Sequence, residues 1–236
     1  MLAIIDERTP AKISDALIAR GHSLLQLKPH PALPAPVASH PDMLLFFARN
    51  FILCTKDYAR IANAELMQIS AACAKPIVTV DERVSDRYPN DILFNCATIG
   101  KHVFCHPSHT AKAIVNDSDY TIHPVRQGYA KCSVVPVGDH ALITADPAIA
   151  SVAKRDGFDV LQITSSKIDL PAYDTGFLGG ATSFAPYCGI KEIYFCGDLQ
   201  THPDAKEITA FCHRHGRIPV SLTKDPLTDL GTVFLI

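Results

Sequence analysis

The sequence predicts an α/β protein built from five repeated units, each made of two strands, a helix and a third strand. Three observations support this fold class. The same order of apolar runs, turns and helical periodicity recurs along the chain. Tight turns join the first two strands of a unit. Finally, 47% of the 236 residues are hydrophobic, enough for one large core, so we expect a single domain over residues 1–236.

The fourth unit is the clearest. Asp146 stands before Pro147 as a helix N-cap with proline at the first helical position, and Gly157 follows the helix as a C-terminal cap. A Gly-Asp pair between the two opening strands predicts a hairpin turn. The predicted elements are strands at Cys132 to Val137 and Ala141 to Thr144, a helix at Pro147 to Arg155 and a strand at Phe158 to Ile163.

Three further units repeat this order. The second has strands at Met43 to Phe47 and Phe51 to Cys54, a helix at Tyr58 to Cys73 and a strand at Pro76 to Val80. The third has strands at Ile92 to Ala97 and His102 to Cys105, a helix at Ser108 to Asn116 and a strand at Tyr120 to His123. The fifth has strands at Gly176 to Phe184 and Glu192 to Cys196, a helix at Pro203 to His215 and a strand at Ile218 to Leu222.

The first unit lacks its opening strand. It has a strand at Leu2 to Ile5, a helix at Pro10 to Arg20 and a strand at Leu24 to Leu27. The apolar run from Thr232 to Ile236 has no helix after it, so we expect it to pair with the N-terminal strand. This pairing of the two termini closes the units into a ring, which leaves no exposed sheet edge.

Composition and charge exclude several classes of partner. The net charge is −2 and the basic residues are scattered, so no nucleic-acid partner is expected. The longest apolar run, Met43 to Ala48, is too short for a membrane span, so no membrane partner is expected either. Asp6 and Glu7 interrupt the first apolar run too early for a signal peptide, which favours a cytoplasmic location.

The cysteines do not form a recognisable metal or disulfide framework. The eight cysteines include no Cys-x-x-Cys pair, so we expect reduced thiols, no metal and no cofactor. Cys54, Cys105 and Cys196 stand at the same place in three units, at the end of the second strand, which favours a packing role.

Two short motifs open the second and fourth units. His40-Pro41-Asp42-Met43 is one, and the other is the run Gln127-Gly128-Tyr129-Ala130-Lys131-Cys132-Ser133. Together with the five units, they resemble the pentein or guanidino-group-modifying superfamily, which includes arginine deiminase, dimethylarginine hydrolase and the amidinotransferases. The resemblance implies a five-bladed α/β propeller, here with a circularly permuted unit order.

The resemblance also implies roles for individual residues. It makes Cys132 the nucleophile, His40 the acid/base and Asp229, in the opening strand of the first unit, the catalytic carboxylate. The substrate-binding residues it implies are Asp42, Asn90 and Asp174. The partner is then a small guanidino or amidino compound, and a homodimer is the assembly considered. Lys131 is expected to face away from Cys132, because successive residues of a strand point to opposite faces.

The chemistry explains why a thiol is needed. A guanidinium carbon is a poor electrophile because its charge is delocalised, and a thiolate is a strong nucleophile at neutral pH. His40 would protonate the departing nitrogen and then activate water or an amine. With water as the second nucleophile the reaction is hydrolysis, and with an amine it is amidino transfer. The sequence does not choose between these two reactions.

Each residue also has a structural interpretation. Cys132 could be a buried packing residue, and Asp229 a turn residue after Pro226. A second copy of the tripeptide, His202-Pro203-Asp204, is interpreted as a helix start. The alternative function is therefore a non-catalytic binding or scaffold protein of the same fold, in which His40 and Cys132 are far apart or occluded.

Overall fold

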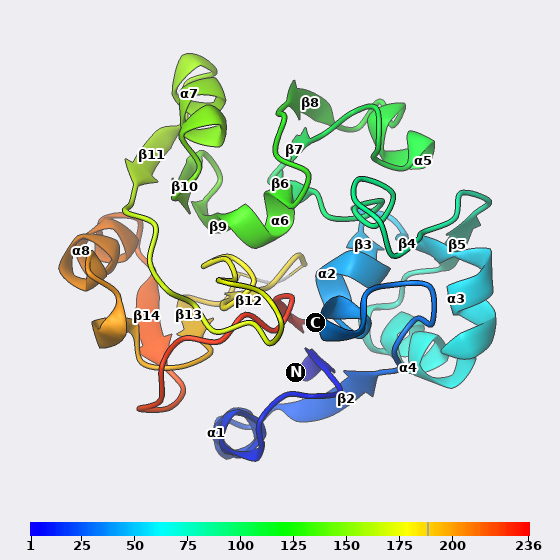
Figure 1. The fold of residues 1–236 in the computed structure, drawn as a ribbon, viewed down its shortest axis with the longest axis horizontal. Helices are drawn as coiled ribbons and strands as arrows, with labels where there is room; N and C mark the ends of the chain where they lie inside the picture. The colour runs from blue at the N-terminus through cyan, green and yellow to red at the C-terminus, as the bar shows by residue number, and fades with distance from the viewer. Residues whose placement is uncertain (188) are drawn as a thin grey trace.

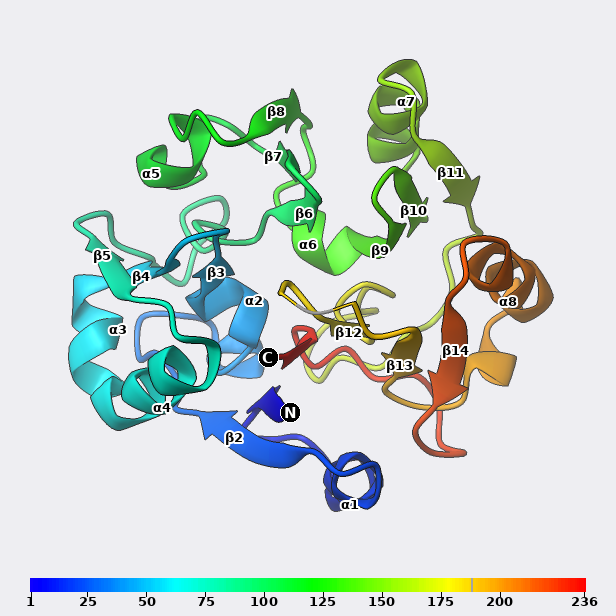
Figure 2. The same cartoon turned by 180° about the vertical axis from the view of Figure 1, so that it is seen from behind.

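Five small sheets lie around the centre of the molecule in the computed structural model, which describes residues 1–187 and 189–236 (Figure 1). The longer helices lie at the periphery, outside the sheets. Figure 2 shows the same arrangement from behind, with the two chain termini close together near the centre. None of the five sheets closes on itself.

Apart from the one-turn helices α2 and α6, which were not predicted, the helices and strands follow the predicted order along the chain. The helices are α1 (Ala11–Ala19), α2 (Pro41–Leu44), α3 (Lys56–Ile61), α4 (Asn63–Cys73), α5 (Lys112–Val115), α6 (Ala130–Ser133), α7 (Pro147–Arg155) and α8 (Ala205–Arg214), with 3-10 turns at Ala35–Val37 and Leu199–Thr201. The strands are β1 (Leu2–Asp6), β2 (Ser23–Leu27), β3 (Phe46–Phe47), β4 (Ile52–Thr55), β5 (Ile77–Val80), β6 (Ala97–Ile99), β7 (His102–Cys105), β8 (Thr121–Pro124), β9 (Val134–Gly138), β10 (Ala141–Thr144), β11 (Asp159–Gln162), β12 (Ser183–Phe184), β13 (Glu192–Phe195), β14 (Ile218–Ser221) and β15 (Val233–Leu235).

Three sheets have the same internal pairing. The orders are β3-β4-β5, β6-β7-β8 and β9-β10-β11, and in each the first two strands are antiparallel and the last two parallel. A helix must connect the parallel pair, because parallel neighbours need a crossover. The predicted order of two strands, a helix and a third strand is thus confirmed in these three sheets. The opening strands of the second and third units begin later than predicted, at Phe46 and at Ala97. The other sheets have the orders β12-β15-β1-β2 and β13-β14.

The predicted pairing of the chain termini is also confirmed. β1 and β15 are antiparallel, with Ala3 opposite Leu235 and Ile4 opposite Phe234. Backbone bonds between Leu2 and Ile236, 2.8 and 3.0 Å long, extend this ladder to the last residue. The first strand, β1, and the last strand, β15, therefore belong to one sheet.

The opening strand predicted over residues 176–184 is wrong for most of its length. Only Ser183–Phe184 is a strand, and β12 pairs with β15, while a single bridge joins Thr182 to Phe195. The reason is the close approach of the two preceding glycines to the centre. A Cβ on Gly179 would lie 2.5 Å from the Cys132 carbonyl oxygen, and one on Gly180 would lie 2.0 Å from Asp229 Oδ1. The segment 176–181 therefore packs against side chains and carbonyls instead of entering a ladder.

The expectation that Cys132 begins a strand is also wrong. Residues 130–133 form the one-turn helix α6, and β9 begins at Val134. The side-chain oxygen of Asn95 accepts hydrogen bonds from the backbone N–H groups of Lys131 and Cys132, at 2.9 and 3.2 Å. These bonds satisfy donors that a strand would have used in its ladder.

The cysteines at the ends of the second strands are buried. Cys54, Cys105 and Cys196 are all fully excluded from solvent, as their equivalent positions in the units predict. The seven cysteines in the described part are free thiols, and Cys188 lies outside that part. Over the described residues, none of the helices combines the length and apolar character needed to cross a bilayer.

Candidate functional site

His40 and Asp42 are placed at the centre by the short helix α2. His40 directly precedes it, and Pro41 occupies the first helical position. The Asp42 N–H donates to the carbonyl of Gly231, 3.1 Å away. Gly231 has a φ of +66°, and a Cβ there would lie 2.2 Å from the Cβ of His40. Only glycine therefore lets the C-terminal segment pack directly against the histidine.

Cys132 lies beside Asp42 in the structure. Its Sγ donates to Asp42 Oδ2 at 3.2 Å and accepts from the Asn95 side-chain amide at 3.0 Å. Asp42 Oδ2 also accepts from the hydroxyl of Thr232 at 3.0 Å, while its Oδ1 is buried with no hydrogen-bond partner among the described residues. The two motifs of the second and fourth units thus meet through these two side chains.

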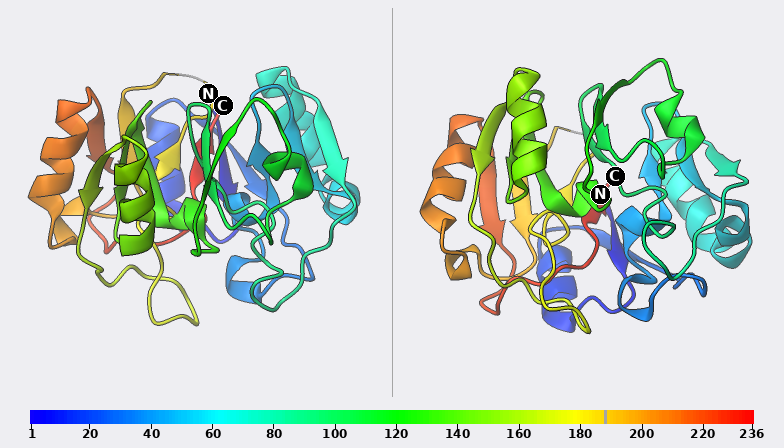
Figure 3. Two further views of the ribbon diagram at one scale, coloured as in Figure 1. Left: turned by 90° about the horizontal axis from the view of Figure 1, so that it is seen from above. Right: turned by 45° about the horizontal axis from the view of Figure 1, so that its top comes forward.

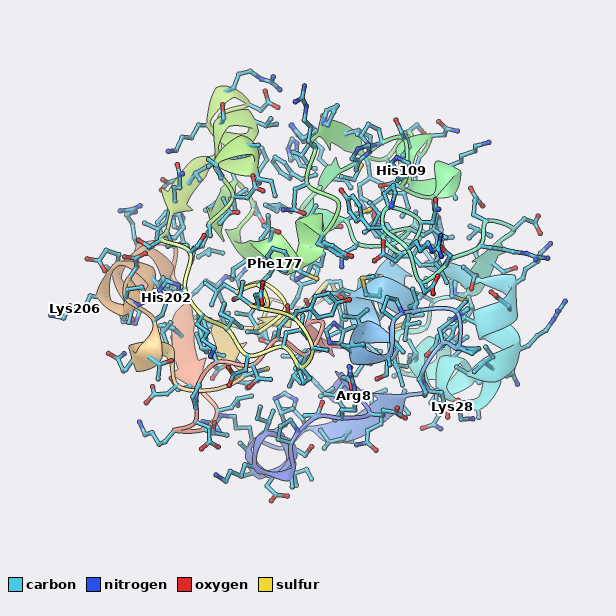
Figure 4. The ribbon with its side chains drawn as sticks, viewed as in Figure 1. Arg8, Lys28, His109, Phe177, His202 and Lys206 are labelled. Atoms are coloured by element: carbon cyan, nitrogen blue, oxygen red, sulfur yellow. The ribbon has the colours of Figure 1, made fainter. Side chains whose placement is uncertain are left out.

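Asp229 is held in place by backbone donors. Its Oδ2 accepts from the N–H of Phe177 at 2.9 Å, and its Oδ1 accepts from the N–H of Gly231 at 3.0 Å. Burial raises the pKa of Asp229, and the nearby His40 opposes this shift. Figure 4 shows Phe177 toward the middle of this face, while Lys206 lies at its edge.

His40 faces carboxylates rather than the thiol. Its Nε2 lies 3.6 Å from Asp6 Oδ2, which is too long for a hydrogen bond, and Arg8 binds the same Asp6 carboxylate at 2.7 Å. Burial lowers the pKa of His40, and Asp229 and then Asp6 act against that shift. Among the described residues no hydrogen bond joins His40 to Cys132. His40 Nε2 is left buried without a partner.

Lys131 points into the site, and the expectation that it faces away from Cys132 is wrong. Because residues 130–133 are helical, the strand alternation does not apply to them. Lys131 is 2% exposed, and its Nζ donates to Thr232 Oγ1 at 2.9 Å. Burial lowers the pKa of Lys131, whereas Asp42, then Cys132 and Asp229, raise it.

The surroundings of Cys132 favour its neutral thiol over the thiolate. Burial raises the pKa of Cys132 well above its usual range, and the carboxylates of Asp42 and Asp229 raise it further. Burial also raises the pKa of Asp42, and Lys131 gives the largest opposing effect. A nucleophilic thiolate would therefore require a change in this charge balance.

The site is closed to solvent. His40 is 2% exposed, Asp42 1% and Cys132 4%. Asp42 and Lys131 face a cavity of about 10 Å³, which is room for no more than about one water molecule. No group of three or more metal-ligating side chains occurs in the part of the chain that the structure describes.

Two predicted substrate-binding residues lie outside this cluster. Asn90 is exposed in a turn, where its backbone bonds to Arg87 and Ser85. Asp174 is also exposed. Polar side chains on exposed turns remain hydrated, so the fold does not direct them to the buried centre. Asp42 is the one predicted substrate-binding residue that the structure brings to Cys132.

Several residues of the site were not anticipated. The sequence could have indicated Asn95, because it is the one polar residue in the apolar run 92–97. Asp6 is an acid at the end of a buried strand, which is also unusual. Thr232 offers no comparable signal, because a threonine at a strand start is common.

The chain between β11 and β12 packs against the site. The chain between β11 and β12 bulges at the end opposite the two termini, as the left view of Figure 3 shows in yellow-green. This segment contributes the Phe177 N–H that binds Asp229. The Phe177 ring also packs against the Tyr129 ring at a tilt of 35°, with ring centroids 6.0 Å apart. Through Phe177 this segment therefore contacts both the Asp229 carboxylate and Tyr129, the residue that precedes α6.

This chain matches one family model and is similar in fold to several solved structures. A family model described as "Family of unknown function (DUF6873)" matches residues 4–234. A search of curated proteins finds no match. Among solved structures, DDAH from Pseudomonas aeruginosa in complex with citrulline has a TM-score of 0.56 at 11% identity, covering 93% of this chain and 91% of that one.

Two other solved structures are similar. SxtG, an amidinotransferase of saxitoxin biosynthesis from Microseira wollei, has a TM-score of 0.52 at 11% identity, over 89% of this chain and 73% of that one. C. jejuni agmatine deiminase has a TM-score of 0.53 at 8% identity, over 94% and 76%. These proteins are members of the pentein superfamily. At such low identity the likeness shows a shared fold, and the chemistry of this chain must be argued from its own residues.

Proposed function

Because this chain belongs to the family described as "Family of unknown function (DUF6873)" and shares the fold of penteins, we propose that it modifies a small guanidino or amidino compound through a covalent bond to Cys132. The observation that carries the proposal is the contact of the Cys132 thiol with Asp42, in a buried cluster that also holds His40 and Asp229. The five sheets are, in this proposal, the five blades of the pentein propeller.

The reaction begins at the thiol. The Cys132 proton is directed at Asp42 Oδ2, so Asp42 is placed to receive it as the thiolate forms. Attack of the thiolate on the amidino carbon breaks a carbon–nitrogen bond, and the departing amine takes a proton from His40. Water or an amine then attacks the carbon of the S-amidino intermediate and gives a proton to His40. The carbon–sulfur bond breaks, and the Cys132 thiolate takes back its proton from Asp42. Asp229 stabilises the charge that His40 carries during these transfers.

The unpartnered oxygen supports the choice of substrate class. Asp42 Oδ1 is a buried acceptor without a donor, which is costly unless a ligand or water supplies one. Guanidino and amidino groups carry N–H donors suited to pair with a carboxylate. A compound of this class would therefore satisfy Asp42 while its carbon lies beside Cys132.

Mass spectrometry of the intact protein tests the proposal. The purified protein is incubated with a panel of charged and uncharged guanidino and amidino compounds and quenched in acid. We expect an amidino adduct on Cys132, its absence in Cys132→Ala, and its slower formation in His40→Asn, because His40 protonates the departing amine. Absence of adduct and of turnover with every compound, in a protein that remains folded, would contradict the proposal.

A second function is favoured by the closure of the site. His40 and Cys132 are 2% and 4% exposed, and the adjoining cavity is about 10 Å³. Such occlusion is what a non-catalytic binding or scaffold protein of this fold would have. In that case Cys132→Ala leaves the protein's binding properties unchanged, and the thiol resists small alkylating reagents until the chain unfolds.

A further inference from the structure

The buried ammonium of Lys131 has a defined set of partners. Its Nζ donates to Thr232 Oγ1 at 2.9 Å, and that hydroxyl donates in turn to Asp42 Oδ2 at 3.0 Å. The same Nζ lies 5.5 Å from the centre of the Phe184 ring. With 2% of its surface exposed, Lys131 is held inside the site by polar and aromatic neighbours together.

Lys131 and Asp42 compensate each other electrostatically. Burial raises the pKa of Asp42, and Lys131 is the largest influence that opposes this rise. Burial lowers the pKa of Lys131, and Asp42 is the largest influence that opposes that fall. A buried carboxylate normally requires a cation to balance it. Here the protein supplies that cation from its own chain, next to the nucleophile in sequence.

The two charged side chains share one small space. Both line the cavity of about 10 Å³, together with aromatic residues that include Phe47 and Phe184. A guanidinium bound to Asp42 would place a second positive charge close to the Lys131 ammonium. Like charges in a buried site disfavour one another strongly, because little water screens them.

An uncharged group meets no such repulsion. Its N–H can donate to Asp42 Oδ1, which has no partner among the described residues. An oxygen or imine nitrogen on the same carbon can accept from Lys131, because an ammonium has three donors and the one hydrogen bond described here uses one of them. That donor would also stabilise negative charge developing on the group during thiolate attack.

We propose that Lys131 is a specificity-determining residue that restricts the Cys132 site to compounds whose reacting carbon–nitrogen group is uncharged at neutral pH. An acylated guanidine or a ureido group has this chemistry, whereas an alkylguanidinium does not. The inference rests on the proposed function, since it concerns the compound that Cys132 attacks. It narrows the substrate class from guanidino compounds in general to uncharged members and their oxygen analogues.

Two alkylating reagents of nearly equal shape test the charge dependence. Chloroacetamide is neutral and chloroacetamidine is cationic, and with both the thiolate displaces chloride to form a thioether. The rate of modification of Cys132 is measured by peptide mass spectrometry and divided by the rate with N-acetylcysteine. We expect the normalised rate with the cationic reagent to be lower by about tenfold or more in the wild-type protein.

Variants at Lys131 provide the second readout. Lys131→Met should raise the normalised preference for the cationic reagent by roughly tenfold to a hundredfold, because the repelling charge is gone and Asp42 lacks a counter-ion. Lys131→Arg keeps the charge and should keep the wild-type preference. Lys12→Met, which removes an exposed lysine paired with Asp225, is the matched control for loss of one charge.

The outcomes separate the two proposals. If Cys132 of the wild-type protein reacts with both reagents at the normalised ratio of the free thiol, the restriction by Lys131 is wrong and the proposed function stands. If Cys132 reacts with neither reagent in any folded variant, both proposals are wrong. The wild-type measurement needs no substitution, so it decides the question even if Lys131→Met does not fold.

Discussion

The thiol of Cys132 donates a hydrogen bond to the carboxylate of Asp42 at 3.2 Å, although 90 residues separate them in the chain. The contact joins a one-turn helix of the fourth unit, α6, to one of the second, α2. It also raises the pKa of Cys132, because the neighbouring carboxylate adds to the effect of burial. The Cys132 side chain is therefore held in place by hydrogen bonds, in surroundings that disfavour its thiolate.

Replacing Asp42 by asparagine should lower the pKa of Cys132. The substitution removes the largest charge that raises this pKa, while the side chain keeps nearly the same shape. Labelling of Cys132 by chloroacetamide, followed across a pH series, should show its midpoint at lower pH than in the wild-type protein. Asp174→Asn, which changes an exposed carboxylate, is the matched control. An unchanged midpoint in Asp42→Asn would contradict the electrostatic role of Asp42.

Asn95→Ala should destabilise the fold by about 2–5 kcal/mol, because two buried backbone donors lose their acceptor. Urea unfolding followed by circular dichroism measures this. Asn90→Ala, five residues earlier and exposed, should stay within about 0.5 kcal/mol of the wild type. Similar effects of the two substitutions would show that Asn95 does not hold α6 in place.

Gly231→Ala should destabilise the protein by about 2–5 kcal/mol, from the positive φ and from the clash with His40 together. Gly21→Ala separates the two causes. Gly21 also has a positive φ, +83°, but a Cβ there meets nothing within 4 Å. Gly21→Ala should therefore lower the free energy of unfolding by only about 1–2 kcal/mol. Thermal unfolding measures both, and equal losses would mean that the packing against His40 adds nothing.

The wild-type protein should lose stability on mild acidification, in part through His40. Its folded pKa lies below the ordinary 6.5, so the unfolded chain binds protons more readily as the pH falls through that value. His40→Asn should therefore reduce the loss of free energy of unfolding between about pH 7.5 and about pH 5.5. The buried carboxyls of Asp42 and Asp229 act in the opposite sense, because their pKa values are raised.

The control for the acid profile is His213→Gln, since His213 is exposed on α8. It should leave the profile as it is in the wild type. Urea unfolding at each pH gives the free energies directly. A steeper acid loss in His40→Asn than in the wild type would reverse the sign argued for His40.

Elements with local signals could be predicted from the sequence. The helix Pro147–Arg155 begins and ends as predicted, because Asp146 caps its N-terminus through bonds to the N–H groups of Ala148 and Ile149. The strands Ala141–Thr144 and His102–Cys105 also have the predicted bounds. Caps and strand alternation act over a few residues, so their effect can be inferred without the rest of the chain.

Pairing of the termini was predictable for a different reason. Thr232 to Ile236 is apolar and has no helix after it, and a buried strand needs a partner for its backbone groups. The strand Leu2–Asp6 was the one that lacked its neighbour. The requirement to satisfy hydrogen bonds thus extended the prediction from local elements to one long-range contact.

The sequence by itself determined the repeated units, the pairing of the termini and the candidates Cys132, His40, Asp42 and Asp229. Only the tertiary structure decided that Lys131 points inward, since α6 is helical because Asn95 binds its backbone. The same holds for His40, which faces Asp6 at 3.6 Å instead of the thiol. These contacts join residues tens of positions apart, and their geometry depends on how whole sheets pack, which no local pattern records.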